Sequence, residues 1–266
     1  MKVNLLTKAV LGAFMLAALA FIYIPMGLVV LNSFNSSRRF AWPPPSLTLE
    51  WWEKAFANEG VRAALLTSAI TAVAASAIAL VLGTLAAFAL SRYDFFGRDA
   101  LSLLIILPIA LPGIVTGIAL NNVFNSYFGG LTLFTVIVGH ATFCVVVVFN
   151  NVSARMRRIG RSLEEASMDL GANRMQTFFR VTLPQMRSAM IAGGLLAFGL
   201  SFDEIIVTVF TAGPGVTTLP IWIFTNLFRP QQAPIVNVVA AALVAVSMVP
   251  IYLAQRLTLG DSKDQV

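Results

Sequence analysis

Six long stretches of the chain are apolar over nearly their whole length, and polar residues gather between them. Each stretch has about 20 residues or more, which lets a helix rising ~1.5 Å per residue cross a ~30 Å hydrocarbon core. The pattern therefore predicts an all-α membrane protein with six transmembrane helices. The predicted spans are residues 9–31, 63–90, 100–120, 131–149, 188–212 and 234–255.

The composition supports this fold class. Of the 266 residues, 58% are hydrophobic and only 11% are charged, which excludes an ordinary soluble domain. A signal peptide is an alternative for the first stretch, but its apolar run exceeds the ~7 to 15 residues of such a segment. We therefore expect a single membrane domain over residues 1–266. Cys144 is the only cysteine, so no intrachain disulfide is possible.

Two of the predicted spans have distinctive local composition. Residues 63–90 are rich in Ala, Ser, Thr and Gly, which lets helix backbones approach closely inside a membrane bundle. Residues 100–120 contain Pro108 and Pro112, and a proline removes a helical hydrogen bond. We therefore expect the first of these spans to pack centrally and the second to be kinked.

The basic residues predict the orientation of the spans. Thirteen of the 18 Lys and Arg residues fall in the segments on one side of the predicted membrane, and the excess of basic residues marks the cytoplasmic side. Both termini are then cytoplasmic, and so is the loop over residues 150–187 between the fourth and fifth spans. This placement explains the net charge of +6 without a nucleic-acid partner.

The loop over residues 150–187 contains a helix-glycine-helix pattern. Ser162 and Glu165 have the spacing of a capping box, which predicts a helix start at Leu163. Gly171 is expected to end this helix in the left-handed conformation, and Asn173 to cap a second short helix that yields near Pro184. The face of the first helix with mainly small side chains would comprise Leu163, Ala166, Ser167 and Leu170.

The chain lacks the signatures of an enzyme. A phosphate-binding loop of the form G-x-x-x-x-G-K-[ST] is absent, because none of the four lysines follows a glycine. His140 is the single histidine, so neither a Ser-His-Asp set nor a zinc site is suggested. His140 could carry a proton, but without an acid or a second histidine in its span we favour a hydrogen-bonded structural imidazole.

The polar loop resembles the conserved loop of binding-protein-dependent ABC importer permeases. That pattern runs E-A-A, three residues, G, and about nine residues to an ending with L-P. Here it reads Glu165-Ala166-Ser167, Gly171 and Val181-Thr182-Leu183-Pro184, with Ser167 in place of the third-position alanine. The resemblance implies that the loop couples the chain to an ATPase. The implied coupling residues are Ser162, Glu164, Glu165, Ala166, Ser167, Asp169, Gly171, Ala172, Leu183 and Pro184.

Three further segments, residues 107–117, 139–155 and 200–220, look like the spermidine/putrescine branch of the same permeases. The resemblance implies a permease subunit in the bacterial inner membrane. Its implied partners are a second, homologous but non-identical permease, two cytoplasmic ATPase subunits, an external substrate-binding protein and membrane lipid, with no nucleic acid. ATP and Mg would bind in the ATPase, and this chain would hold no cofactor or metal.

Two acids inside the fifth span, Asp203 and Glu204, are the candidate cargo residues. Their position predicts a depth of ~22 Å from the cytoplasmic end of the span. Isolated carboxylates there need a cation or water, which a polyamine cargo could supply. Alternatively, the acids cap helix ends. Candidate aromatic faces for the same cations are Phe198, Phe202 and Trp222.

Three other functions stay open from the sequence. The same machine could carry a zwitterionic amine or an amino acid, which would need a basic group along the path as well. Buried acids and broken helices also occur in gradient-driven secondary transporters. A membrane scaffold without transport activity is the third alternative, and it would not hold an ATPase stoichiometrically.

Overall fold

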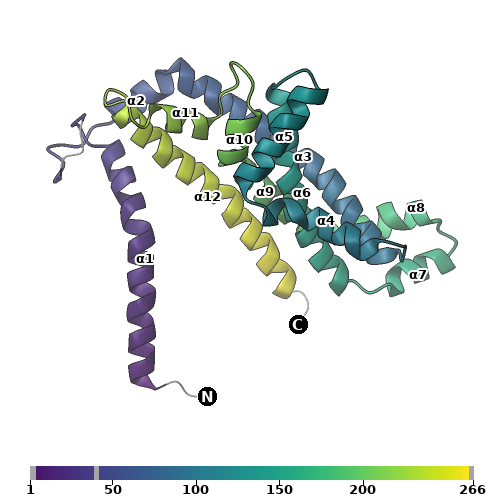
Figure 1. Ribbon diagram of the computed structural model, residues 1–266. Coiled ribbons are helices and arrows are strands. Elements are labelled where there is room, and N and C mark those ends of the chain that lie inside the picture. Colours follow the sequence, from purple (N-terminus) through teal and green to yellow (C-terminus); the bar gives the residue numbers. More distant parts are fainter. Residues whose placement is uncertain (1–3, 39–41, 264–266) are drawn as a thin grey trace. The chain divides into compact units, whose positions relative to one another are not determined.

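The computed structural model describes residues 4–38 and 42–263, with side chains up to Arg256 (Figure 1). The chain forms two compact units, one of Met1–Arg62 with Trp222–Ala245 and the other of Ala63–Ile221 with Val246–Val266. Lys2 and Arg39, used above to predict orientation, lie outside the described residues.

The first unit contains a long apolar helix and a short amphipathic one. Along helix α1 (Leu5–Ser33) the most apolar window has no buried residues, as expected for a helix in contact with lipid. Helix α2 (Glu50–Ala57) is tied to the segment after α1, because the Trp51 indole donates to Asn35 O at 2.9 Å. The rings of Phe34 and Trp52 stack beside this bond, 5.4 Å apart.

The second unit is a bundle in which the contacts of two helices, α6 and α9, form the centre. In Figure 1, α7 and α8 lie at one end of this unit and α10 at the other. The helices wholly within it are α4 (Arg98–Ala110), α5 (Gly113–Tyr127), α6 (Leu133–Arg158), α7 (Ser162–Asp169), α8 (Arg174–Thr177), the π-helix η1 (Phe178–Thr182), α9 (Leu183–Phe202) and α10 (Ile206–Thr211). Three helices have residues in both units, namely α3 (Glu59–Arg92), α11 (Leu219–Asn226) and α12 (Ala233–Lys263).

Small residues bring α3 and α6 together. Ala75 and Ala79 are fully buried in the core. At Gly83, an added Cβ would lie only 3.0 Å from Val145 O and Phe149 N, so the two backbones are nearly in contact. The predicted close packing of the second span is therefore confirmed.

Four of the described helices are long and apolar enough to cross a membrane, namely α1, α3, α6 and α12. Helices α4 and α5 together would make a fifth span, bent by 105° where Leu111 and Pro112 interrupt the helix. The predicted kink is thus a full break. Helix α9 does not meet the same criterion, so the predicted span over residues 188–212 stays a prediction.

Two helix ends differ from the ends of the predicted spans. The fourth span was expected to end at residue 149, but α6 continues to Arg158. Its extra turns are stabilised because Val152 and Met156 are buried in the core and Arg155 Nε donates to Gln185 O at 3.1 Å. The fifth span was expected to be continuous over residues 188–212, but the helix stops at Phe202 and restarts at Ile206.

Candidate functional site

The loop between α6 and α9 folds as expected in outline, but its helix start differs. Helix α7 begins at Ser162, and its N-cap is Arg161 in a helical conformation without a side-chain cap. The predicted capping box of Ser162 and Glu165 was therefore wrong. Because Ser162 already lies within the first turn, its hydroxyl is not placed to accept from the third amide of the helix.

The end of α7 is a Schellman motif. The Ala172 amide donates to Ser167 O at 3.1 Å, and the Gly171 amide donates to Met168 O at 2.9 Å. Gly171 has φ of +89°, which confirms the predicted left-handed stop. An added Cβ at Gly171 would meet nothing within 4 Å, so only the backbone conformation requires glycine there.

The second short helix begins as predicted but does not end as predicted. Asn173 Oδ1 accepts from the Gln176 amide at 2.9 Å, and the Asn173 amide donates to Gln176 Oε1 at 3.0 Å, forming a reciprocal cap. The helical path does not yield near Pro184, because it passes through the π-helix η1 into α9. Pro184 lies in the first turn of α9, where its missing N–H is tolerated.

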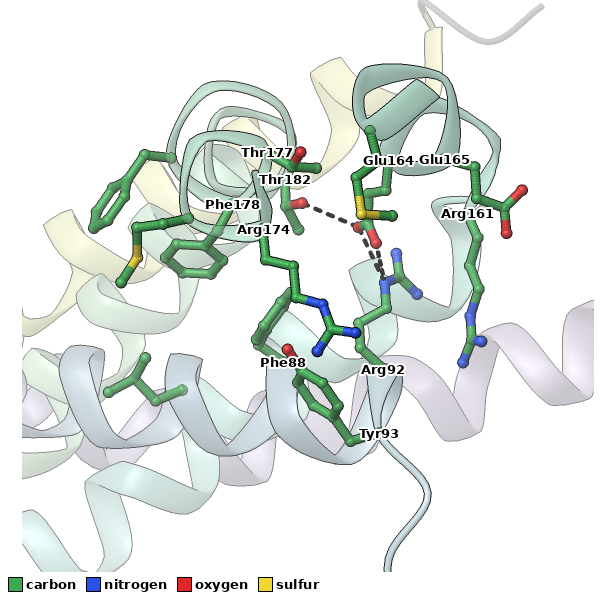
Figure 2. Close-up of a pocket in the computed structure, with 14 residues that line it drawn as sticks. Phe88, Arg92, Tyr93, Arg161, Glu164, Glu165, Arg174, Thr177, Phe178 and Thr182 are labelled. Carbon is green, nitrogen blue, oxygen red and sulfur yellow. Dashed lines mark hydrogen bonds and ion pairs between the residues drawn. The ribbon is translucent and has the colours of Figure 1, made fainter. Parts of the chain in front are cut away.

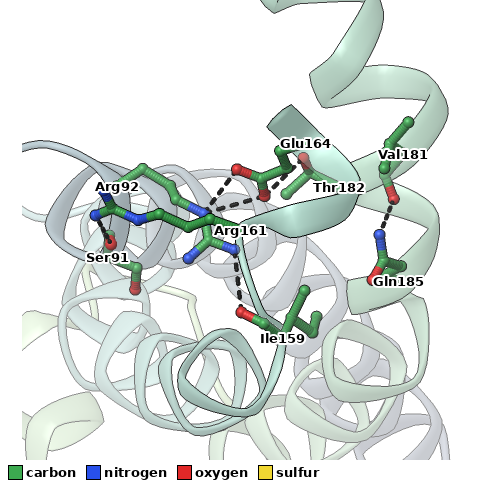
Figure 3. Close-up of polar contacts among 8 residues, drawn as sticks. All are labelled: Ser91, Arg92, Ile159, Arg161, Glu164, Val181, Thr182 and Gln185. Carbon is green, nitrogen blue, oxygen red and sulfur yellow. Dashed lines mark hydrogen bonds and ion pairs between the residues drawn. The ribbon is translucent and has the colours of Figure 1, made fainter. Parts of the chain in front are cut away.

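An ion pair fastens the loop to α3 (Figure 3). Arg92 Nε lies 3.0 and 2.9 Å from the two carboxylate oxygens of Glu164. Thr182 Oγ1 donates to Glu164 Oε1 at 3.1 Å, and Arg92 Nη2 donates to Ile159 O at 3.4 Å. The pair is nearly buried, with side-chain exposures of 10% and 12%. We call Arg92, Ile159, Glu164 and Thr182 the loop network.

The loop network determines which side of α7 is buried. Glu164 lies off the predicted small-residue face and is buried, and Ser167 hydrogen-bonds to Thr177 at 3.1 Å. On the predicted face, Leu163 and Leu170 are 57% and 90% exposed. The sequence reasoning missed the network because its charged partners lie 72 positions apart. The only available signal was an arginine at the end of an apolar span.

A cavity of about 650 Å³ opens between the end of α3 and the loop helices. In Figure 2, Arg92, Glu164 and Thr182 lie together on one wall and Arg174 extends beside them. The walls combine aromatic and apolar side chains with charged ones. The lining residues are Leu85, Phe88, Arg92, Tyr93, Arg161, Glu164, Glu165, Met168, Arg174, Met175, Thr177, Phe178, Phe179 and Thr182.

Most of the remaining predicted coupling residues are exposed. Glu165, Ala166 and Asp169 are exposed on α7, as is Pro184 at the start of α9, while Leu183 is half-buried. Helix α7, the turn at Gly171 and the π-helix η1 thus bring most of the predicted coupling residues to one end of the second unit. The loop network holds these elements against α3.

The second candidate region is the break between α9 and α10, which we call the helix break and define as residues 203–205. Asp203 is the C-cap of α9, and its amide donates to Gly199 O at 3.3 Å. Glu204 Oε1 accepts from the Val207 amide at 2.8 Å, so this acid caps the start of α10. The two predicted cargo acids therefore differ in their partners.

The Asp203 carboxylate is exposed, and no hydrogen bond or ion pair joins it to another described residue. It lies at the C-terminal end of α9, where the helix dipole is negative and favours a cation. Broken helices with such ends form cation sites in membrane transporters. Asp203 is thus the acid of this region that is free to meet a ligand.

Two of the predicted aromatic residues lie on α9, which ends at Asp203, and the third belongs to the other unit. The rings of Phe198 and Phe202 stack 5.6 Å apart, but Phe202 is buried. Trp222 belongs to the first unit, where it is buried and its Nε1 lies beside Gly60. Of the three, only the half-buried Phe198 presents part of its ring near the end of α9. The described residues contain no cluster of His, Cys, Asp and Glu side chains that could hold a metal.

His140 lies beside the helix break. Its ring nitrogens are 2.8 Å from Ser201 Oγ and 2.8 Å from Thr208 Oγ1, and the side chain is 1% exposed. The expected hydrogen bonds of this imidazole are confirmed.

Comparison with known proteins identifies the fold and the family. Residues 79–258 match the family described as "Binding-protein-dependent transport system inner membrane component". The chain belongs to this family. Its members are membrane components of transport systems and not enzymes, and the chain is accordingly a multi-pass inner-membrane protein. The resemblance seen in the loop is thereby confirmed.

Two curated relatives cover most of the chain. It is 33% identical over 253 residues to the putrescine transport system permease protein PotI of Escherichia coli, covering 91% of this chain and 89% of the relative. It is 31% identical over 248 residues to the spermidine/putrescine transport system permease protein PotC of Haemophilus influenzae, covering 93% and 95%.

A solved structure shows the same fold. A chain of a bacterial ABC transporter involved in the import of the acidic polysaccharide alginate matches with a TM-score of 0.73 at 16% identity, covering 95% of this chain and 94% of that one. At this identity the similarity supports the fold of the permease and carries no information on its cargo.

Proposed function

We propose that the chain is the permease subunit of an ATP-driven importer that moves polyamines such as putrescine and spermidine into the cytoplasm. The observation that carries the proposal is the exposed, unpartnered Asp203 carboxylate at the end of a broken helix in a chain related to putrescine permeases over nine-tenths of its length. A flexible polyammonium ion would replace the water around that carboxylate.

The electrostatics of the helix break favour an organic cation. A carboxylate within the hydrocarbon region costs several kcal/mol unless it is hydrated or paired, so Asp203 must face water or a cation there. The negative end of the α9 dipole adds to the attraction. Glu204 is already used by the Val207 amide, and its cargo role is correspondingly weaker. Phe198, Phe202 and Trp222 are retained as path candidates, with Phe198 favoured by its exposure.

The loop end of the second unit is suited to bind the ATPase. Leu163 and Leu170 form an exposed apolar face on a helix whose opposite side is fastened by the loop network. An exposed apolar face on a rigid support is typical of a docking surface. We propose that residues 162–184 couple the permease to ATP hydrolysis, with Glu165 and Asp169 exposed to the ATPase and Gly171 setting the turn.

The proposed assembly follows from the same considerations. Six spans, with α9 and α10 forming the fifth, would place both termini and the loop in the cytoplasm. A second permease would complete the pore, two ATPase subunits would bind ATP with Mg, and an external binding protein would deliver the amine. Homologous but non-identical permeases are favoured, in line with the resemblance to the spermidine/putrescine branch.

The decisive experiment is reconstitution of the complete transporter in vesicles. The chain expressed alone should neither hydrolyse ATP nor transport. The same chain with its ATPase, second permease and binding protein should take up labelled putrescine and spermidine when ATP is supplied.

Each rival function predicts a different result. ATP-dependent uptake of a neutral amino acid but not of putrescine would indicate that the cargo is a zwitterion and not a polyamine. Amine uptake driven by an ion gradient without ATP would indicate a secondary transporter. Failure to co-purify with any ATPase would favour a scaffold, although the family assignment already argues against both of the last two.

A further inference from the structure

His140 bridges the two helices on either side of the helix break. Nδ1 of its ring is 2.8 Å from Ser201 Oγ at the end of α9, and Nε2 is 2.8 Å from Thr208 Oγ1 in α10. Among the described side chains, only that of His140 hydrogen-bonds to both helices. The ladder of backbone hydrogen bonds cannot cross residues 203–205, so the imidazole joins two segments that the backbone leaves disconnected.

The hydrogen-bond donors determine how this bridge works. The Thr208 hydroxyl has one proton, which it donates to Glu204 O at 3.0 Å. Thr208 Oγ1 must therefore accept from His140 Nε2–H. In the neutral ring Nδ1 is then an acceptor, and the Ser201 hydroxyl donates to it. All three side chains are satisfied in one arrangement, so the bridge has a defined geometry.

Other contacts hold α10 but do not span the break. Asn121 Nδ2 donates to Phe210 O at 2.6 Å, and Thr135 Oγ1 donates to Thr211 O at 2.7 Å. Gly117 admits the Phe210 ring, because an added Cβ would lie 2.6 Å from that side chain. These contacts fasten the far end of α10. The end next to Asp203 is fixed to α9 through His140.

We infer that His140 is a positioning residue for cargo: it holds the helix break in one geometry and so sets where the Asp203 carboxylate meets an amine. The inference rests on the proposed function for its consequence in transport, but the bridge itself does not depend on the cargo. Without the imidazole, α9 and α10 would sample more relative orientations, and Asp203 would meet a cation with less preorganisation.

Two measurements on the complete transporter test this inference. The first is uptake of labelled putrescine and spermidine. His140→Leu removes both bonds and should raise the apparent KM for uptake about tenfold, since each hydrogen bond contributes modestly. Thr208→Val should produce part of this effect. Combined with His140→Leu it should raise the KM little further, because the bond between His140 and Thr208 is already lost in His140→Leu. ATP hydrolysis per assembled complex should stay within about twofold, since each lost bond is worth little at a distance from the ATPase.

The second measurement is independent of cargo. Spin labels at Leu200→Cys and Val209→Cys, in a Cys144→Ala background, lie on exposed positions either side of the break. Dipolar broadening in the EPR spectrum reports their separation. His140→Leu should widen the distance distribution. The matched control is Thr142→Val, because the Thr142 hydroxyl bonds only to Gly139 O within its own helix, and this change should leave both readouts unaltered.

The outcomes separate the two proposals. An unchanged distance distribution in His140→Leu would overturn the positioning role, whatever the cargo. A widened distribution together with a raised KM supports it. A widened distribution in His140→Leu, in a complex whose wild type transports no amine, would support the bridge and refute the polyamine proposal. If His140→Leu fails to assemble, Thr208→Val gives the same test with a smaller change in volume.

Discussion

Glu164 in the loop network and Asp203 at the helix break are both acids in a mainly apolar chain, and they differ in where their oxygens find partners. Glu164 is buried, paired with Arg92 and bonded by Thr182. Asp203 is exposed and unpartnered among the described residues. The first acid is occupied inside the chain and stabilises the loop, whereas the second is available to something outside it.

The same distinction separates neighbouring acids within each region. Beside Glu164, the exposed Glu165 has no ion pair among the described residues, and beside Asp203, Glu204 is used to cap α10. Each region thus contains one acid that holds the structure and one that is free. Sequence position alone could not assign these roles, because adjacent residues on or near a helix point in different directions. The predictions below test this division.

The largest effect is expected from Glu164→Ala. Removing the carboxylate leaves the nearly buried Arg92 guanidinium without its counter-ion, which costs about 3 kcal/mol or more. The permease should lose thermal stability in detergent and assemble poorly with its ATPase. A double-mutant cycle with Arg92→Ala would measure the coupling between the two side chains.

Glu165→Ala is the matched control, since the side chain is exposed one position further along. It should leave thermal stability unchanged within about 0.5 kcal/mol and reduce ATP-coupled transport. Equal losses of stability in both variants would contradict the division between a structural and a free acid in the loop.

Asp203→Asn should have the next largest effect. The substitution keeps the shape and removes the charge, so a cationic cargo loses a close ion contact worth about 1 to 3 kcal/mol in a partly hydrated site. Uptake of spermidine should fall roughly tenfold to a hundredfold at low amine concentration. The more highly charged spermidine should suffer more than putrescine, and assembly should be normal.

Glu204→Gln is the control at the helix break. A glutamine oxygen can still accept from the Val207 amide, so the cap of α10 is kept. Amine uptake by this variant should lie within about threefold of wild type, because a neutral amide oxygen caps the helix nearly as well as a carboxylate oxygen does. A larger loss in this variant than in Asp203→Asn would exchange the roles assigned to the two acids.

Gly171→Val should have a smaller effect on stability. The left-handed φ of +89° costs a residue with a side chain about 1 to 2 kcal/mol, while the open space around the position adds no clash. The turn at Gly171 should change conformation, and ATP-coupled transport should fall although the permease still inserts in the membrane and assembles. Gly171→Asn is the control, because asparagine tolerates this conformation and should retain most of the transport.

The apolar pattern predicted most of the helices because length and hydropathy are properties of each segment alone. The helices α1, α3, α6 and α12 follow the predicted spans, and the left-handed Gly171 and the cap at Asn173 depend only on local chemistry. The bend at Pro112 was recognised as a kink but not as a full break, since proline disrupts a helix without defining the angle that follows.

The rest of the candidate site depends on contacts between distant segments. Arg92 meets Glu164 across 72 positions, and His140 meets Ser201 across 61, so neither partner was visible in its local sequence. The helix break at Asp203 was considered only through the alternative that the two acids cap helix ends, for a related reason. From the sequence alone, an apolar segment with two acids is interpreted as one continuous span. The hydrogen bond from the Val207 amide to Glu204, which marks the start of a new helix, is visible only in the structure.

The smallest predicted effect concerns the two caps of the loop helices, where one sequence prediction was confirmed and the other was wrong. Asn173 makes a reciprocal cap with Gln176, so Asn173→Ala should destabilise the permease by about 1 kcal/mol. Ser162 lies inside the first turn of α7 and caps nothing, so Ser162→Ala should change stability by less than about 0.5 kcal/mol. Thermal unfolding of the two variants in the same detergent measures the difference directly. A loss in Ser162→Ala equal to that in Asn173→Ala would mean that α7 begins one residue later than its backbone indicates, with the Ser162 hydroxyl capping it after all.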